Sequence, residues 1–324
     1  GYPHVRTNSA RYRSRPRLLT AMSLSRFVCH SRKAFPLPAL HTSIRSVSAA
    51  AVTPSPTIMA LASQLYAPYD IKGQVALVTG ASSGIGESIA WRLAELGTSL
   101  VITARREDRL QKLKAEIQAK YSVAVHTQTL DMRDLKAVKA MPGVLPPEFQ
   151  KVDILVNNAG LAVGVDKAYE ANIDDYVTML EANVTGLMAM TRALVPGMVE
   201  RKRGHVVNMS SVAGIEGYPG GAGYNASKFA VNGYSIALRH DLCGTPVRVT
   251  TISPGAVQTE FSTVRLGDKT AADAMYAGFD PLTAADIADN TVYALTRPEH
   301  VQICDILVYA TKQSSARSIA RNTD

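Results

Sequence analysis

The sequence predicts an α/β fold in which a single parallel sheet is covered by helices on both faces. Two observations lead to this prediction. Short apolar runs alternate along the chain with longer segments of helical periodicity, as in strands joined by crossover helices. A glycine-rich turn separates the first apolar run from the first helical segment. We therefore expect one doubly wound domain of about 250 residues.

The expected elements follow the apolar runs in chain order. The first strand is QVALV (74–78), before a helix at 85–96, and the second is SLVITA (99–104), before a charged helix at 107–120. Five more strand candidates are VAVHTQTL (123–130), DILVNN (153–158), HVVNMS (205–210), VRVTTIS (247–253) and ICDILVY (303–309). The least regular segment is 261–281, which we expect to be a mobile flap.

The first residues differ from the remainder of the chain. Residues 1–69 contain nine basic and no acidic residues, so the other 255 residues carry a net charge of −1 out of a total of +8. This composition predicts a targeting leader or disordered extension at 1–65, mitochondrial import, and a catalytic domain at 66–324. The alternative is that translation starts near Met59, which would leave a cytoplasmic protein.

Several classes of protein are not indicated. No run approaches the 18 apolar residues of a membrane span, and the body of the chain is not basic enough to indicate a nucleic-acid partner. The three cysteines have no paired spacing, and the seven histidines form no cluster, so we expect no metal. His126 and His205 lie in strand candidates, where a structural role is the expected one. The expected partner is a small-molecule substrate.

The turn TGASSGIG follows the first strand candidate. Glycines allow backbone N–H groups to approach a pyrophosphate, and the following helix N-terminus favours negative charge. The spacing differs from the common G-x-G-x-x-G pattern. A purely structural glycine turn is the alternative. The candidate cofactor-binding residues here are Gly80, Ser82, Ser83, Gly84, Ile85 and Gly86.

The second strand candidate ends in TARRED. NAD-binding folds usually present an acid at this point to the ribose 2′-hydroxyl, but here Ala104 is followed by Arg105 and Arg106. Two guanidinium groups suit a 2′-phosphate, which predicts NADP as the cofactor. The alternative is an exposed helix start, although positive charge there opposes the helix dipole unless an anion is bound.

Together these motifs resemble the short-chain dehydrogenase/reductases, from about residue 72 to the C-terminus. The resemblance rests on TGASSGIG, on NNAG (157–160), on NVTG (183–186), on PGAVQT (254–259), and on Ser211 followed by Tyr224 and Lys228. It implies a Rossmann-type single domain and an active oxidoreductase. A Tyr–Lys pair four residues apart also arises by chance, so the surrounding motifs are what give this pair its meaning.

The resemblance implies a role for each catalytic candidate. Tyr224 would be the general acid/base, and Lys228, one helical turn on, would lower its pKa toward neutrality. Ser211 would hold the substrate oxygen, and Asn183 would anchor a water that links Lys228 to solvent. The helices that contain Asn183 and Tyr224 would pair between the subunits of a homotetramer.

The resemblance also extends the cofactor site beyond the glycine turn. Asp131 would lie near the adenine ring, with a plain surface aspartate as the alternative. Tyr218 and Tyr234 lack a matching lysine, and packing or pocket-wall roles are expected for them. The further cofactor-binding candidates are Met132, Asn158, Ala159, Gly160, Pro254, Gly255, Val257 and Thr259, together with Tyr224 and Lys228.

Within this family, SPGAVQTEFSTVR and the end ICDILVYATKQSSA are similar to NADP-dependent 3-hydroxy acid dehydrogenases of the serine and allo-threonine type. Arg265, the first basic residue after the PG turn, is the candidate for holding the substrate carboxylate. The alternative is an ion pair of Arg265 with Glu260 or Asp268 that orders the flap. The alternative functions are a carbonyl reductase of larger ketones and a non-catalytic dinucleotide-binding protein.

Overall fold

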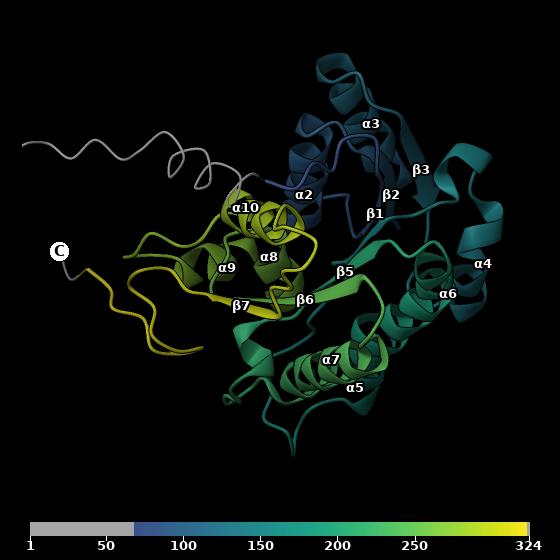
Figure 1. Cartoon of the computed structure of the whole chain (residues 1–324). Helices are drawn as coiled ribbons and strands as arrows, with labels where there is room; N and C mark the ends of the chain where they lie inside the picture. The colour runs from purple at the N-terminus through teal and green to yellow at the C-terminus, as the bar shows by residue number, and fades with distance from the viewer. Residues whose placement is uncertain (1–67, 323–324) are drawn as a thin grey trace, which may run out of the picture. The chain divides into compact units, whose positions relative to one another are not determined.

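A computed structural model of the chain describes residues 68–322, so the predicted leader lies outside the described residues. Seven parallel strands form one sheet in the order β3-β2-β1-β4-β5-β6-β7, which confirms the doubly wound Rossmann-type fold (Figure 1). The strands are β1 (Val75–Thr79), β2 (Ser99–Ala104), β3 (Val125–Thr129), β4 (Ile154–Asn157), β5 (Gly204–Met209), β6 (Val247–Pro254) and β7 (Asp305–Val308).

The central strands are apolar because helices cover them on both sides. All residues of β1 and of β6 are buried, whereas the edge strand β7 alternates between exposed and partly buried positions. The chain runs outward from β1 to β3 and then returns to add β4 on the other side of β1. The strand order therefore reverses beside β1, and ligands of doubly wound folds bind at the carboxyl ends of the strands at such a point.

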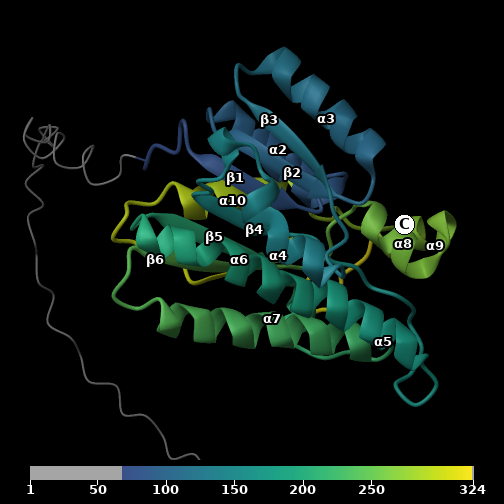
Figure 2. The ribbon, with the colours of Figure 1, turned by 90° about the vertical axis from the view of Figure 1, so that its right-hand side faces the viewer.

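Two helical layers enclose the sheet, as Figures 1 and 2 show. Buried side chains of α2, α3 and α10 share one core with one face of the sheet, and those of α4, α6 and α7 share a second core with the other. The helices are α2 (Gly84–Glu95), α3 (Glu107–Lys120), α4 (Leu135–Val144), α5 (Ile173–Leu180), α6 (Gly186–Glu200), α7 (Ala222–Asp241), α8 (Glu260–Leu266), α9 (Lys269–Met275) and α10 (Ala284–Leu295).

The segment expected to be irregular contains two short helices, α8 and α9. Thr259 begins α8 by accepting a hydrogen bond from the Phe261 N–H, and Gly267 ends it with a left-handed backbone at φ 67°. Asp268 then caps α9 by accepting from two backbone N–H groups. The segment is therefore partly helical, because these caps stabilise helices too short to show a periodic pattern, and its mobility as a flap stays a prediction.

Candidate active site

The glycine turn lies at the carboxyl end of β1, against the loop that follows β4. Gly80 has φ 68°, and a β-carbon there would lie 2.8 Å from the Ala159 Cα atom, so only glycine fits this turn. Ser82 and Ser83 complete the turn, and α2 begins at Gly84 and continues through Ile85 and Gly86. Ser83 makes no side-chain cap on α2. The first N–H groups of this helix can therefore serve an anion.

Arg106 joins the end of β2 to the glycine turn. Its guanidinium donates to the Ser82 hydroxyl oxygen at 3.0 and 3.1 Å and to the Ser83 hydroxyl oxygen at 2.7 Å. Its third nitrogen donates to a carboxylate oxygen of Glu260 at 3.0 Å. Arg105 is exposed, and its charge contributes to lowering the pKa of Asp131. The two arginines therefore face different neighbours.

Asp131 follows β3 and pairs with a neighbour in sequence. Arg133 donates to its carboxylate at 2.7 Å, and this hydrogen bond is the main cause of the lowered pKa of Asp131. Met132, the next residue, is buried. Both residues lie at the carboxyl edge of the sheet, and Asp131 is only partly exposed there.

The loop after β4 is tied to the glycine turn by Thr79. The Thr79 hydroxyl oxygen accepts from the backbone N–H groups of Asn158 and Ala159, each at 3.0 Å. The Asn158 side chain donates to the Thr79 carbonyl at 2.9 Å. Gly160 follows, and a β-carbon there would lie 3.1 Å from Asn183 Oδ1 and 3.5 Å from Lys228 Nζ. The end of β4 therefore lies against two of the catalytic candidates.

Asn183 lies in a π-helical turn, η2 (Glu181–Thr185), between α5 and α6. Its side chain accepts from the Leu161 N–H and donates to the Leu161 carbonyl, both at 2.8 Å, and it also donates to Ser227 at 3.0 Å. A π-helical turn within a helix often marks a functional position. Asn183 thus links the loop after β4 to α7.

Ser211, Tyr224 and Lys228 come together beside this loop. Ser211 begins a short 3-10 turn after β5, where its hydroxyl oxygen accepts from the Ala213 N–H at 3.1 Å. Tyr224 and Lys228 are buried on one face of α7, and Ser211 lies close enough to the Tyr224 hydroxyl to lower its pKa. Lys228 Nζ lies 5.7 Å from the centre of the Tyr224 ring. Ser211, Tyr224 and Lys228 therefore form one group with Asn183, the fourth catalytic candidate.

Burial sets the protonation of the Tyr–Lys pair. It raises the pKa of Tyr224 well above the ordinary value, and the neighbouring Tyr218 adds to this, while Ser211 and Arg265 act in the opposite direction. Burial also lowers the pKa of Lys228 to about 8. Lys228 is not among the groups that shift the pKa of Tyr224, and its Nζ donates to the Met209 carbonyl at 2.8 Å.

The lowered pKa of Lys228 predicts a stability change with pH. Below about pH 8 the lysine is charged in both the folded and the unfolded state, and burying the charge destabilises the fold. Between about pH 8 and the ordinary value of 10.5 the unfolded state binds more protons, so stability rises with pH. We expect wild type to gain stability relative to Lys228→Met across this window, by up to about 1.4 kcal/mol per pH unit.

Urea unfolding of both proteins from pH 7 to pH 10 measures this gain. Both proteins retain Tyr224, so its own titration cancels in the difference. A difference in unfolding free energy that stays constant with pH would show that Lys228 has an ordinary pKa in the folded chain.

Arg265 reaches from α8 into the same site. It donates to the Tyr218 hydroxyl at 3.0 Å and to the carbonyls of Gly220 and Gly164 at 3.2 and 3.4 Å. Its guanidinium carbon lies 5.7 Å from the centre of the Tyr224 ring, and both residues line a small cavity of about 10 Å³. These partners differ from the acidic ones considered from the sequence, since Glu260 pairs elsewhere.

The remaining cofactor candidates surround the exit of β6. Pro254 ends the strand, and its carbonyl accepts weakly from Ser211 at 3.5 Å. Gly255 bonds to β7, and the carbonyl of Val257 accepts from Tyr276 at 2.8 Å. Thr259 leads directly into α8. This loop therefore connects the sheet to the helix that carries Arg265.

Three residues with close contacts in this region were not identified as candidates from the sequence. Arg109 donates to both carboxylate oxygens of Glu260 at 2.8 Å. The Phe261 ring packs 5.6 Å from the Tyr224 ring, centre to centre. Gln313 accepts from the Ala256 N–H at 2.8 Å. The spacing of Arg109, one turn beyond Arg106 on α3, is the only sequence signal that could have identified one of them.

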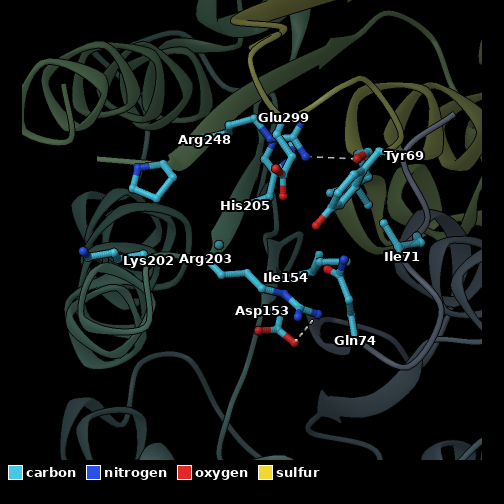
Figure 3. A pocket seen from close by; sticks show the side chains of 13 residues that line it. Tyr69, Ile71, Gln74, Asp153, Ile154, Lys202, Arg203, His205, Arg248 and Glu299 are labelled. Carbon is cyan, nitrogen blue, oxygen red and sulfur yellow. Dashed lines mark hydrogen bonds and ion pairs between the residues drawn. The ribbon is translucent and has the colours of Figure 1, made fainter. Parts of the chain in front are cut away.

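A second cavity, of about 90 Å³, lies at the amino ends of β4, β5 and β6 and so away from this site (Figure 3). His205 lines it beside Asp153 and Arg248. The Thr250 hydroxyl donates to the Ile303 carbonyl at 2.7 Å, so it accepts from His205 Nε2 at 2.8 Å. Burial lowers the pKa of His205 well below its ordinary value. His205 is therefore a neutral, structural histidine, as its strand position predicts.

Among residues 68–322, no cluster of three or more His, Cys, Asp or Glu side chains is arranged to hold a metal ion. Within the same residues, no helix combines the length and the apolar character that a membrane crossing requires.

Comparison with known proteins matches most of the described residues. The family model described as short chain dehydrogenase matches residues 74–269. An NADP-dependent 3-hydroxy acid dehydrogenase of Schizosaccharomyces pombe is 44% identical over 78% of this chain and 98% of its own length. A sulfoacetaldehyde reductase of Chromohalobacter salexigens is 43% identical over 76% and 99%. The closed form of a serine dehydrogenase complexed with NADP+ superposes with a TM-score of 0.72, at 42% identity over 77% of this chain and 100% of that one.

Proposed function

The chain belongs to the short-chain dehydrogenase family and is an NADP-dependent oxidoreductase, and from this premise we propose that it acts on a small 3-hydroxy acid such as serine or allo-threonine. The observation that carries the proposal is the position of Arg265, whose guanidinium lies 5.7 Å from the Tyr224 ring. A 3-hydroxy acid has its carboxylate two bonds from the reacting carbon. A cation beside the proton-carrying residue therefore suits this substrate class.

The names of the relatives support an anionic substrate. A 3-hydroxy acid and sulfoacetaldehyde are both small, and each carries an acidic group close to the carbon that is oxidised or reduced. A single guanidinium can recognise a carboxylate or a sulfonate through paired hydrogen bonds. A reductase of larger uncharged ketones remains the alternative, and it has no corresponding use for Arg265.

The residues of the site fit NADP. The turn at Gly80 brings backbone close to the start of α2, and Arg106 lies over this turn with its charge beside two serine hydroxyls. We propose that the pyrophosphate lies at this turn and that Arg106, with Arg105, binds the 2′-phosphate. When bound, NADP supplies or accepts a hydride at its nicotinamide ring.

We propose that Tyr224 moves the proton of the reaction. Its hydroxyl gives a proton to the substrate oxygen in reduction and takes it back in oxidation. Ser211, which lies beside Tyr224 and lowers its pKa, holds the same oxygen in place. The raised pKa of Tyr224 keeps the phenol protonated, as reduction requires. Lys228, with a pKa of about 8, can change its protonation near neutral pH and support proton exchange with solvent.

Cofactor preference provides the next prediction. We expect NADP to be preferred over NAD by about tenfold or more in kcat/KM, because a guanidinium–phosphate pair makes strong charge-assisted hydrogen bonds. Replacing both Arg105 and Arg106 by glutamine should remove most of this preference by weakening NADP, with NAD little changed. Steady-state kinetics with both cofactors measures it, and an equal loss for NADP and NAD would contradict the assignment.

A substrate panel tests the proposed function directly. Serine, allo-threonine, 3-hydroxypropanoate, sulfoacetaldehyde and larger uncharged ketones are each supplied with the matching form of NADP, and absorbance of the reduced cofactor is followed. Higher kcat/KM for the small anionic compounds supports the proposal. A preference for the uncharged ketones would favour the carbonyl reductase, and no turnover of any compound would favour the non-catalytic protein.

We also propose that the protein forms a homotetramer, and exposed apolar residues on α7 support this. Phe229 and Ile236 are 47% and 49% exposed and lie two turns apart on the helix that contains Tyr224. Such a stripe is suited to pairing with a second copy of α7. Sedimentation of the Phe229→Glu, Ile236→Glu variant should show smaller particles than wild type, and unchanged particles would exclude α7 from the interface.

We propose further that the protein is imported into mitochondria, and the basic, acid-free composition of residues 1–69 supports this. A fluorescent reporter fused to residues 1–65 tests it. A diffuse cytosolic signal would favour a start near Met59.

A further inference from the structure

Glu260 occupies a position where an anion of the cofactor is expected. Its carboxylate accepts from Arg106 at 3.0 Å and from Arg109 at 2.8 Å, and Arg106 also donates to Ser82 and Ser83. Both arginines hold the pKa of Glu260 below its ordinary value, with Arg109 the larger cause, so the group is negatively charged near neutral pH. Glu260 is thus the shared acceptor of Arg106, which precedes α3, and Arg109, which lies in its first turn.

One of these donors, Arg106, is also assigned above to the 2′-phosphate. Arg106 has already used its nitrogens on Ser82, Ser83 and Glu260, so a phosphate that binds this guanidinium must share it with a carboxylate. Two anions close together repel each other, and the ion pairs are about half exposed. An exposed ion pair contributes little to stability, so it can open readily.

Glu260 is also the first residue of α8, which reaches the reacting centre. Phe261, the next residue, packs 5.6 Å from the Tyr224 ring, and Arg265 lies 5.7 Å from the same ring. A displacement of the start of α8 would therefore move a helix that contacts the Tyr224 ring through Phe261 and Arg265. The two ends of the site, 154 positions apart in sequence at Arg106 and Glu260, are joined by this ion pair.

We propose that Glu260 is a positioning residue that competes with the 2′-phosphate of NADP: the phosphate takes over Arg106 and Arg109, Glu260 is released, and the start of α8 becomes free to move. This inference rests on the proposed placement of the 2′-phosphate at Arg106. NAD lacks that phosphate and leaves Glu260 on the arginines. The device couples the identity of the cofactor to the helix that carries Arg265.

Binding of two nucleotide fragments tests the competition. The probes are 2′,5′-ADP, which carries the 2′-phosphate, and 5′-AMP, which does not, and calorimetry measures their affinity for the full chain. Glu260→Gln keeps the shape of the side chain and removes its charge. We expect this variant to bind 2′,5′-ADP about threefold or more tightly than wild type, and 5′-AMP equally. Equal or weaker binding of 2′,5′-ADP would overturn the proposal.

Two matched variants separate the possible causes. Asp108→Asn removes an exposed carboxylate from the first turn of the same helix α3, and Asp108 makes none of the ion pairs found among residues 68–322. It should leave the ratio of the two affinities unchanged, and an equal gain in this variant would overturn a specific role for Glu260. Arg106→Gln should weaken 2′,5′-ADP. If it does not, the placement of the phosphate fails, which is an outcome distinct from failure of the Glu260 competition.

Hydrogen exchange of the amides in 260–275 tests the coupling. In wild type, 2′,5′-ADP should speed exchange at the start of α8, whereas 5′-AMP should not. Glu260→Gln should exchange faster without ligand and respond to neither probe. Exchange in α8 that is identical in wild type and variant, with and without 2′,5′-ADP, would overturn the coupling.

Discussion

Replacing Tyr224 by phenylalanine is expected to lower kcat at least about 100-fold, which corresponds to about 2.7 kcal/mol of lost transition-state stabilisation. The phenol is the group that can pass a proton to the substrate oxygen, and Ser211 lies beside it. The ring itself remains, and it keeps its packing against Phe261. The fold and the affinity for NADP should therefore be preserved.

Tyr234→Phe is the matched control for this substitution. Tyr234 lies on the same helix, ten positions on, and packs against the core below α7. It should retain nearly full turnover. Kinetics with saturating NADP, together with calorimetry of NADP binding, distinguishes lost chemistry from lost binding. Near-normal turnover of Tyr224→Phe would remove this residue from the proton transfer.

Replacing Arg265 by methionine should raise KM for 3-hydroxy acids by about tenfold or more, because even one charge-assisted hydrogen bond to a carboxylate contributes about 1.5 to 3 kcal/mol. Methionine retains much of the apolar length of the side chain and loses the charge. The matched substrates are 3-hydroxypropanoate and its uncharged amide. The increase in KM should appear for the acid and be small for the amide.

Arg265 also holds two loops, and a second variant isolates that role. Tyr218→Phe removes the hydroxyl to which Arg265 donates at 3.0 Å but leaves the guanidinium in place. It should affect the acid and the amide to a similar, small extent. If Arg265→Met raises KM equally for both compounds, Arg265 orders the loops at Gly164 and Gly220 and does not recognise the carboxylate.

Local patterns were enough to predict the sheet and its first helices. The strand expected at 99–104 and the helix expected at 107–120 coincide with β2 and α3, and the helix expected at 85–96 is shifted by one residue. These elements have long periodic or apolar patterns, and short-range physics decides them. The helices α8 and α9 have seven residues each. Their existence depends on capping contacts, for which hydrophobic periodicity is not a guide.

The sequence also identified most of the candidate site, because its residue types occur in fixed motifs at the carboxyl ends of the strands. It did not identify Arg109 or Phe261. Neither belongs to a motif, and each enters the site only because α8 folds back over the glycine turn and Tyr224. Contacts of this kind depend on the packing of distant segments and leave no local pattern.

By itself, the sequence determined the parallel α/β architecture and the family, and it supplied the candidates for binding NADP and moving a proton, since each follows from residue type and spacing. Only the tertiary structure decided what surrounds those groups. It placed Lys228 against the Met209 carbonyl, raised the pKa of Tyr224 by burial, and paired Glu260 with Arg106. Desolvation and ion pairing depend on which segments lie within a few ångströms of one another, and the complete fold alone determines those distances.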